Sequence, residues 1–218
     1  MVTVDGLVAG GHFFADDPAD AIAKKALRVN VSDLAAKGAA PLGFLLTLAL
    51  PRDWRAEWLE SFARGLGEDA ARFDCPLLGG DTVSTPGPLT LSVTAFGAVP
   101  AGRMVRRTGA RVGDALYVSG AIGDAALGLL ARRGTMDGDG KVFLIDRYLL
   151  PQPRLALAPA LLAHASGAMD VSDGLVGDPG QRGALDLAVD RAQPLQRFLD
   201  RGEGEVGAEE QLVDDLIF

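Results

Sequence analysis

Pro76-Leu77-Leu78-Gly79-Gly80-Asp81-Thr82 is a short apolar run that stops at two glycines and is followed by one aspartate. Two consecutive glycines cost backbone entropy, so they indicate either a positive φ or another segment that approaches the main chain closely. A carboxylate and a hydroxyl directly after such a pair suit a metal-bridged phosphate site, whereas a plain glycine turn with a capping aspartate is the alternative. Further carboxylates in matching contexts would favour the phosphate site.

Composition limits the classes of partner. The chain has 218 residues, enough for one large domain or two small ones, and its 48% apolar and 23% charged residues are typical of soluble globular proteins. A net charge of −8 disfavours nucleic acid or an anionic membrane as a partner, because both are bound by clustered cations. The single cysteine excludes an internal disulfide, and the longest apolar run, residues 44–50, is far shorter than the about 20 residues of a membrane span. We therefore expect a cytoplasmic protein.

Hydrophobic periodicity predicts an α/β (α+β) chain. Over residues 1–102 the expected order is strand, helix, strand, helix, strand, strand. These elements are a half-buried strand from residue 2, a helix over 17–37 with Asp17 as N-cap and Pro18 first, a continuous buried strand over 42–50, a helix capped by Asp53, the run before Gly79, and a strand over 89–95. A second pattern follows, with a strand over 115–118, helices from about 125 and over 141–149 and 155–165, and a strand over 168–173 with Asp170 and Ser172 on one face.

Five aspartates lie at strand ends, on a helix face or beside glycines: Asp5, Asp33, Asp81, Asp170 and Asp173. Asp33 shares a helical stripe with Ile22 and Ala26, which predicts a buried carboxylate that needs a cation. A metal and a Lys or Arg from elsewhere both remain possible partners, and neither Asp33 nor Asp81 has an obvious cation nearby in sequence. Mg²⁺ is usually held by one or two carboxylates together with phosphate oxygens and water, so single aspartates from separate elements fit several magnesium ions on a polyphosphate.

Two weaker signals are ambiguous. His12 follows Gly10-Gly11 and could contact a substrate, although a lone histidine before Phe13-Phe14 is more often a satisfied loop or core residue. The glycine-rich turn over residues 119–124 could bind phosphate at a helix start or could be only a tight connection. Neither a P-loop nor a protein-kinase motif set is present in the sequence.

Five motifs occur in order along the chain: Asp5-x6-His12, VNVSDLAAKGA at 29–39, LGGDT at 78–82, RTGA at 107–110 and MDVSDGL at 169–175. Together they closely resemble the thiamine-monophosphate kinase family over residues 1–178. That family shares its fold with aminoimidazole ribonucleotide synthetase. The resemblance therefore implies an N-terminal α/β domain over 1–102 that pairs into a dimeric barrel, a partial C-terminal α/β domain over 103–178, and a divergent acidic tail over 179–218.

The resemblance also implies a reaction and a site. The γ-phosphate of ATP would pass directly to thiamine monophosphate, giving thiamine diphosphate, in a homodimer with several Mg²⁺ ions. By the same resemblance, the metal ligands are Asp5, Asp33, Asp81, Asp170 and Asp173, the ATP contacts are Gly80, Asp81, Arg107 and Ser172, the thiamine monophosphate contact is His12, and the catalytic residues are Arg107 and Asp81.

The chain departs from the family at three places. Val4 stands where the family has Ser or Thr, an upstream acidic segment with a further metal ligand is not seen, and residues from 179 match nothing in the family. The alternatives are therefore a non-catalytic fragment that dimerises and at best binds nucleotide, or a sister enzyme that acts on another small molecule. Residues 179–218 contain nine acidic residues against four arginines, and we expect them to be weakly ordered. We also expect them to leave the sheet around Val118 and Val171 with an unpaired edge or an exposed apolar face.

Overall fold

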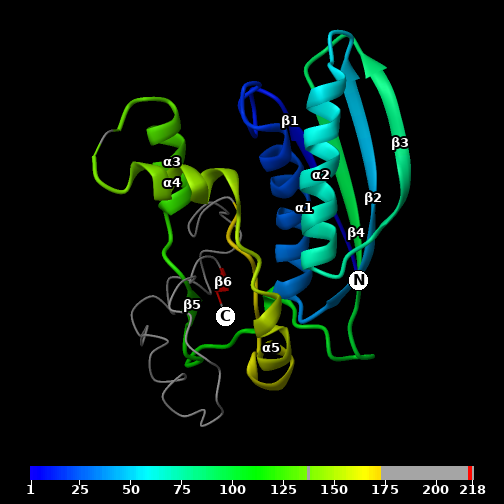
Figure 1. Ribbon diagram of the computed structural model, residues 1–218. Coiled ribbons are helices and arrows are strands. Elements are labelled where there is room, and N and C mark those ends of the chain that lie inside the picture. Colours follow the sequence, from blue (N-terminus) through cyan, green and yellow to red (C-terminus); the bar gives the residue numbers. More distant parts are fainter. Residues whose placement is uncertain (137, 173–215, 218) are drawn as a thin grey trace.

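The computed structural model describes residues 1–136, 138–172 and 216–217. A four-stranded sheet carries two long helices on one face (Figure 1). The strands are β1 (Val2–Val8), β2 (Ala40–Pro51), β3 (Leu77–Thr85) and β4 (Thr90–Ala98), in the order β1-β4-β2-β3. β4 is antiparallel to β1 and β2, and β2 is parallel to β3. The predicted α/β class and the predicted element order are confirmed.

The core lies between this sheet and the helices α1 (Ala19–Ala36) and α2 (Ala56–Arg72). β4 alternates strictly, and its buried side chains Leu91, Val93 and Ala95 are at most 1% exposed. The two helices approach each other closely at Gly65, where a Cβ atom would lie 2.6 Å from the Cα of Asp20. A larger residue at 65 would therefore push the helices apart.

The other face of the sheet is open in the described part of the chain. Val4 and Leu45 are 63% and 39% exposed, because alternate side chains of each strand point away from the helices. The prediction of a continuous buried strand over 42–50 was therefore wrong, since only every second side chain of β2 is covered by helices.

Two predicted helix starts were also wrong. α1 starts after Pro18, which occupies the N-cap position, while the carboxylate of Asp17 accepts a hydrogen bond from the Phe14 N–H instead. α2 starts after Arg55, so Asp53 does not cap it, and Trp54 remains 47% exposed. The end of α1 is as predicted, with Lys37 as C-cap and Gly38 at φ 71°.

The glycine pair lies inside β3 rather than at a turn. A Cβ atom at Gly80 would be 1.9 Å from the carbonyl oxygen of Leu46 on β2. The close approach that the two glycines indicated is therefore present, whereas the alternative of a plain glycine turn is not.

In the second half of the described chain, short helices alternate with turns and irregular segments. It contains β5 (Val118–Ser119), α3 (Asp124–Arg132), α4 (Lys141–Leu149), α5 (Ala158–His164) and the short 3-10 turns Arg107–Gly109 and Leu155–Leu157. The strand predicted over 168–173 is not formed in its described part, where only Met169 has a bridge assignment. The β6 strand (Leu216–Ile217) pairs antiparallel with one edge of β5 in a two-stranded sheet, and the other edge of β5 has no strand partner among the described residues. The rest of the tail prediction concerns residues outside the described ones.

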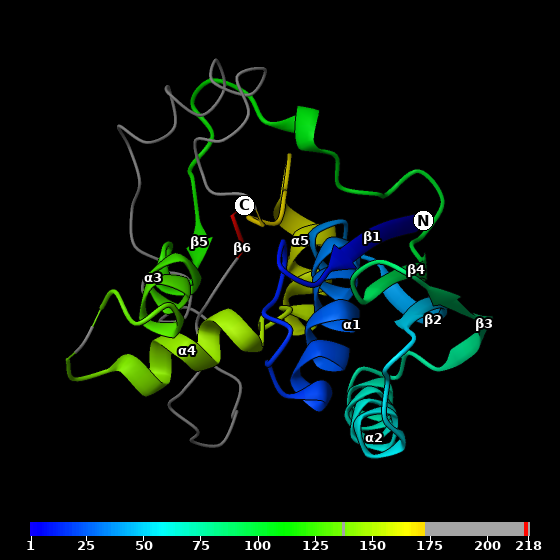
Figure 2. The same cartoon turned by 90° about the horizontal axis from the view of Figure 1, so that it is seen from above.

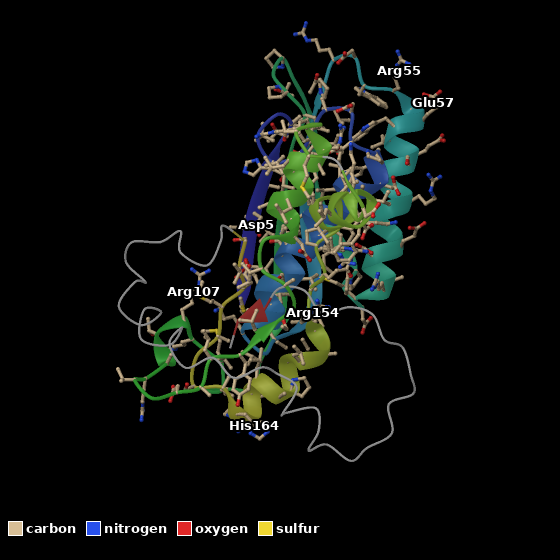
Figure 3. All side chains as sticks on the ribbon, turned by 90° about the vertical axis from the view of Figure 1, so that its left-hand side faces the viewer. Asp5, Arg55, Glu57, Arg107, Arg154 and His164 are labelled. Atoms are coloured by element: carbon tan, nitrogen blue, oxygen red, sulfur yellow. The ribbon has the colours of Figure 1, made fainter. Side chains whose placement is uncertain are left out.

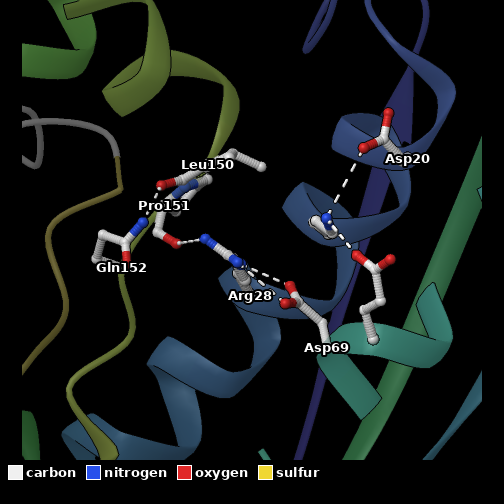
Figure 4. A network of polar contacts seen from close by, with 8 residues as sticks. Asp20, Arg28, Asp69, Leu150, Pro151 and Gln152 are labelled. Atoms are coloured by element: carbon white, nitrogen blue, oxygen red, sulfur yellow. Dashed lines mark hydrogen bonds and ion pairs between the residues drawn. The ribbon is translucent and has the colours of Figure 1, made fainter. Parts of the chain in front are cut away.

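A buried ion pair joins these parts (Figure 4). The guanidinium of Arg28 on α1 donates to both carboxylate oxygens of Asp69 on α2, at 2.5 and 3.0 Å, and to the carbonyl oxygen of Pro151 at 3.3 Å. Arg28 and Asp69 are only 3% and 2% exposed. One side chain thus connects α1, α2 and the segment that follows α4. No helix in the described ranges is long and apolar enough to cross a membrane.

Candidate functional site

Two of the predicted carboxylates meet near the end of α1. The Thr3 hydroxyl on β1 donates a hydrogen bond to Asp33, and Asp170 lies near enough for the negative charge of Asp33 to raise the pKa of its carboxyl. An arginine completes the group, because an Arg107 guanidinium nitrogen lies 3.7 Å from the Oδ1 atom of Asp170. The structure therefore brings Asp33, Asp170 and Arg107 together from three separate segments, and we call them the Asp33–Asp170 site.

Asp170 is the most perturbed acid in this site. Its side chain is 9% exposed, and its buried Oδ1 atom has no hydrogen-bond partner among the described residues. Burial, and next the negative charge of Asp33, raise the pKa of the Asp170 carboxyl to about 7, while Arg107 opposes the shift. Two close carboxylates with an unsatisfied buried oxygen are a site at which a cation would replace a proton.

Lys37 is a residue of this site that the sequence interpretation did not include. Its ammonium donates to the carbonyl oxygen of Ala168 at 2.7 Å and so joins the end of α1 to the segment that carries Asp170. Burial and then the charge of Arg107 lower the pKa of Lys37, whereas Asp170 and Asp33 raise it. The statement that Asp33 has no cation nearby in sequence was therefore wrong. Lys37 follows Asp33 by four residues, and this i, i+4 spacing was the signal that could have identified it.

Asp33 itself is less buried than its helical stripe predicted. Ile22 and Ala26 are at most 1% exposed, but Asp33 is half-buried. The reason is that Asp33 lies on the side of α1 that faces the edge strand β1 and the segment carrying Asp170, and not on the side that the middle of the sheet covers. Its carboxylate can therefore be reached by a ligand.

Asp5 lies on β1 on the same face as Thr3, because residues two apart on a strand point the same way. Figure 3 shows Asp5 and Arg107 on the same side of the molecule. A pocket of about 430 Å³ opens beside the site, with Lys37, Arg106 and Arg107 among its lining residues. Asp5 is thus near the Asp33–Asp170 site, and the adjoining pocket is lined by both apolar and cationic side chains.

His12 lies at the other end of β1. Its Nδ1 atom accepts a hydrogen bond from the Val8 N–H at 3.1 Å, and its side chain is exposed. From Thr3 to Val8 the strand extends for about 17 Å. His12 therefore does not touch the Asp33–Asp170 site but lies along the same strand, with Asp5 between them.

Gly80 and Asp81 lie far from this site. The register of the sheet pairs Asp81 with Thr47, Thr47 with Ser92 and Ser92 with Gly6. Asp81 is thus on β3, three strand spacings or about 14 Å from β1. Its exposed side chain points to the open face, opposite to Asp5. Within this chain, the structure does not bring Asp81 to the Asp33–Asp170 site.

Of the remaining predicted residues, Ser172 is exposed and follows Asp170 by two positions, whereas Asp173 lies outside the described residues. Among the residues that the structure describes, no three Asp, Glu, His or Cys side chains are close enough together to hold a metal ion. Asp33 and Asp170 still fit one Mg²⁺, because this ion commonly takes only one or two protein carboxylates and completes its shell with phosphate oxygens and water. They are the residues that would hold it here.

Comparison with known proteins identifies relatives of this chain. Residues 1–99 match the family model described as AIR synthase related protein, N-terminal domain. A thiamine-monophosphate kinase from Caulobacter vibrioides is 51% identical over 179 residues, which cover 82% of this chain and 50% of that protein. The crystal structure of the thiamine-monophosphate kinase from Stenotrophomonas maltophilia has 43% identity and a TM-score of 0.76, covering 83% of this chain and 58% of that one.

A further solved structure is described as AaThiL complexed with AMPPCP and TMP. It has 34% identity and a TM-score of 0.75, and it covers 84% of this chain and 60% of that one. The chain spans about half the length of the curated relatives it matches. By sequence, by its N-terminal domain and by fold, the chain is therefore a relative of the thiamine-monophosphate kinases.

Proposed function

We propose that this chain provides the N-terminal domain and the phosphate site of a kinase that transfers the γ-phosphate of ATP to thiamine monophosphate. The observation that carries the proposal is the pair of close carboxylates, Asp33 and Asp170, with Arg107 beside them. Support comes from the relatives named thiamine-monophosphate kinase and from the related structure with AMPPCP and TMP.

Five of the predicted site residues have the following roles in this proposal. Asp33 and Asp170 would hold Mg²⁺, which neutralises phosphate charge when it is bound. The Arg107 side chain is 50% exposed, so its guanidinium can leave Asp170 and bind the transferred phosphoryl group, where charge is spread over three oxygens. Asp5 would add a further carboxylate on β1, and His12 would contact thiamine monophosphate at the other end of that strand. A phosphate group bound at Asp33 and thiamine monophosphate bound at His12 would thus both lie along strand β1.

We also propose a homodimer formed through the open face of the sheet. Val2, Val4, Leu45 and Val83 are between 39% and 63% exposed there, and a second copy would cover them. Asp81 lies on this same face, so its predicted contacts to metal and ATP would be made beside or across that interface. The domain borders at 102 and 178, the ATP contacts of Gly80 and Ser172, the metal role of Asp173 and a cytoplasmic location belong to the same proposal.

A coupled ADP-release assay with thiamine monophosphate and Mg²⁺ tests the proposal. We expect Arg107→Ala to lower the rate by about 10²- to 10³-fold, as is typical when one donor to transition-state charge is lost. The matched control is Arg55→Ala, because Arg55 is exposed and lies at the far end of α2 (Figure 3). Turnover no higher than a blank would support the non-catalytic alternative, and faster turnover with another acceptor would support the sister enzyme.

A further inference from the structure

The turn that carries His12, residues 9–17, is held by three helices, and we call it the His12 loop. It is closed internally by hydrogen bonds from the Gly10 N–H to Phe13 O at 2.8 Å and from the Asp17 N–H to Phe14 O at 3.0 Å. Figure 2 shows α4 beside the first turns of α1, which follow this loop directly. The loop therefore lies where the sheet domain and the α3–α4 helices meet.

Lys25 on α1 contacts the His12 loop through the main-chain carbonyl of His12. It is 7% exposed, and its ammonium lies 3.4 Å from the carbonyl oxygen of His12 and 3.6 Å from the centroid of the Tyr148 ring on α4. Burial lowers the pKa of Lys25 to about 8, and the charge of Asp17 opposes the shift. Burial of an ammonium group is unfavourable, and the contacts that offset this cost at Lys25 are the His12 carbonyl oxygen and the face of the Tyr148 ring.

Arg132 on α3 holds the other end of the loop. Its guanidinium bonds Asp16 at 2.8 Å and Asp17 at 2.9 Å and lies 4.7 Å from the Phe14 ring centroid. Phe14 in turn meets the Tyr148 ring edge to face at 6.0 Å. The buried carboxylate of Asp17 also accepts from the Phe14 N–H at 2.9 Å. The middle of the His12 loop and its Asp16–Asp17 end are thus contacted by cations from different helices.

We propose that Lys25 is a positioning residue for the phosphoryl acceptor, with Arg132 as its partner: together they fix the His12 loop so that His12 meets thiamine monophosphate in one place. The inference rests on the proposed function, and it assigns the fixed loop to the acceptor rather than to ATP. The Asp33–Asp170 site is at the opposite end of β1, so loosening the loop changes acceptor affinity and leaves the phosphate site intact.

The test compares Lys25→Met with Lys24→Met in the full chain. Met keeps the length and apolar stem of lysine but removes its charge. Lys24 is the matched control because its ammonium pairs with Glu68 of α2 at 2.7 Å and with Asp20 of α1 at 3.7 Å, and neither partner belongs to the loop. Lys25→Arg keeps the charge and is the conservative variant. The measurements are kcat and KM for thiamine monophosphate and for ATP, and hydrogen exchange at the His12 and Phe14 amides.

We expect Lys25→Met to raise KM for thiamine monophosphate about tenfold, which corresponds to about 1.4 kcal/mol, while KM for ATP and kcat change less than twofold. Exchange at the two amides should accelerate in Lys25→Met alone, and Lys25→Arg should restore most of both properties. Equal behaviour of the two Met variants, or a parallel rise in both KM values, would overturn the inference. If Lys25→Met turns over with an unchanged KM for thiamine monophosphate, only the positioning role of Lys25 is overturned. If the unmodified chain shows no turnover, the proposed function is overturned, and the acceptor role falls with it.

Discussion

The substitution Asp69→Asn probes the buried ion pair between α1 and α2. Asparagine has nearly the same shape as aspartate, so it removes the charge without opening a cavity. Arg28 would then remain 3% exposed, with one amide oxygen and the Pro151 carbonyl as its acceptors. An uncompensated buried guanidinium is the expected consequence.

Breaking a buried ion pair by removing one partner costs about 3 to 5 kcal/mol. We expect the upper part of this range, because the pair has two hydrogen bonds and both residues are at most 3% exposed. Domains of this kind have total stabilities of about 5 to 15 kcal/mol, so the loss would be a large fraction of the free energy of unfolding. With an m-value of about 2 kcal/mol/M, the urea midpoint should fall by roughly 2 M.

Urea unfolding followed by tryptophan fluorescence measures this change. Trp58 stacks on Phe62 in α2, with ring centroids 5.1 Å apart, and therefore reports on the helix that carries Asp69. The control is the double variant Arg28→Met with Asp69→Leu, which should be far less destabilised because no buried charge remains. A loss below about 1 kcal/mol in Asp69→Asn, or an equal loss in the double variant, would refute the reasoning that an unpaired charge causes the effect.

Three further outcomes are expected. Asp33→Asn or Asp81→Asn should abolish metal-dependent ATP binding while the circular dichroism spectrum stays unchanged; ATP binding by calorimetry that neither substitution nor EDTA alters would contradict the metal assignment. In metal-free protein between pH 3.8, the ordinary pKa of an aspartate, and about pH 7, the folded state keeps a proton on Asp170 that the unfolded state has released. The free energy of unfolding should therefore fall as pH rises through this window, by up to about 1.4 kcal/mol per pH unit. Asp170→Asn should flatten the curve of unfolding free energy against pH, and an equally steep curve in this variant would exclude Asp170 as the cause. Val4→Asp should lower the dimer fraction in sedimentation velocity, since Val4 is 63% exposed on the open face, while Trp54→Asp outside that face should not; an unchanged dimer would place the interface elsewhere.

The sequence predicted element types well and element ends poorly. β4 could be predicted because its alternation records one covered and one open face, and α4 (Lys141–Leu149) lies where the sequence placed it. The start of α1 could not be predicted from local capping rules, because the carboxylate of Asp17 is used by Arg132, a residue 115 positions away in the chain. The burial of β2 was also overestimated because it depends on distant parts of the structure. An apolar strand has the same composition whether its outer face is covered by a helix of the same chain or by a second copy of the chain.

The site was predicted as a set of residues but not as a geometry. Motif resemblance identified Asp33, Asp170 and Arg107, which the structure brings together. It also placed Asp81 in the same group, although the pleat of β3 points Asp81 to the opposite face of the sheet. Which face of the sheet a β3 side chain points to depends on the pairing register of that strand. The register is fixed by β2, whose paired residues lie 33 or 34 positions away in the chain, so no local pattern could reveal it.

The pairing of β1 with β4 affects how the chain folds during synthesis. Val2 pairs with Phe96, so β1 meets β4, its one sheet partner among the described residues, after more than 90 further residues have been made. At about 5 to 20 residues per second, β1 waits roughly 5 to 20 seconds on the ribosome without its ladder of hydrogen bonds. Because such non-local pairing must overcome the entropy of closing a long loop, β1 is expected to join the sheet last. During that interval its valines and free backbone groups are open to pairing with another nascent chain, and the vulnerability of this protein to aggregation would lie in its first eight residues.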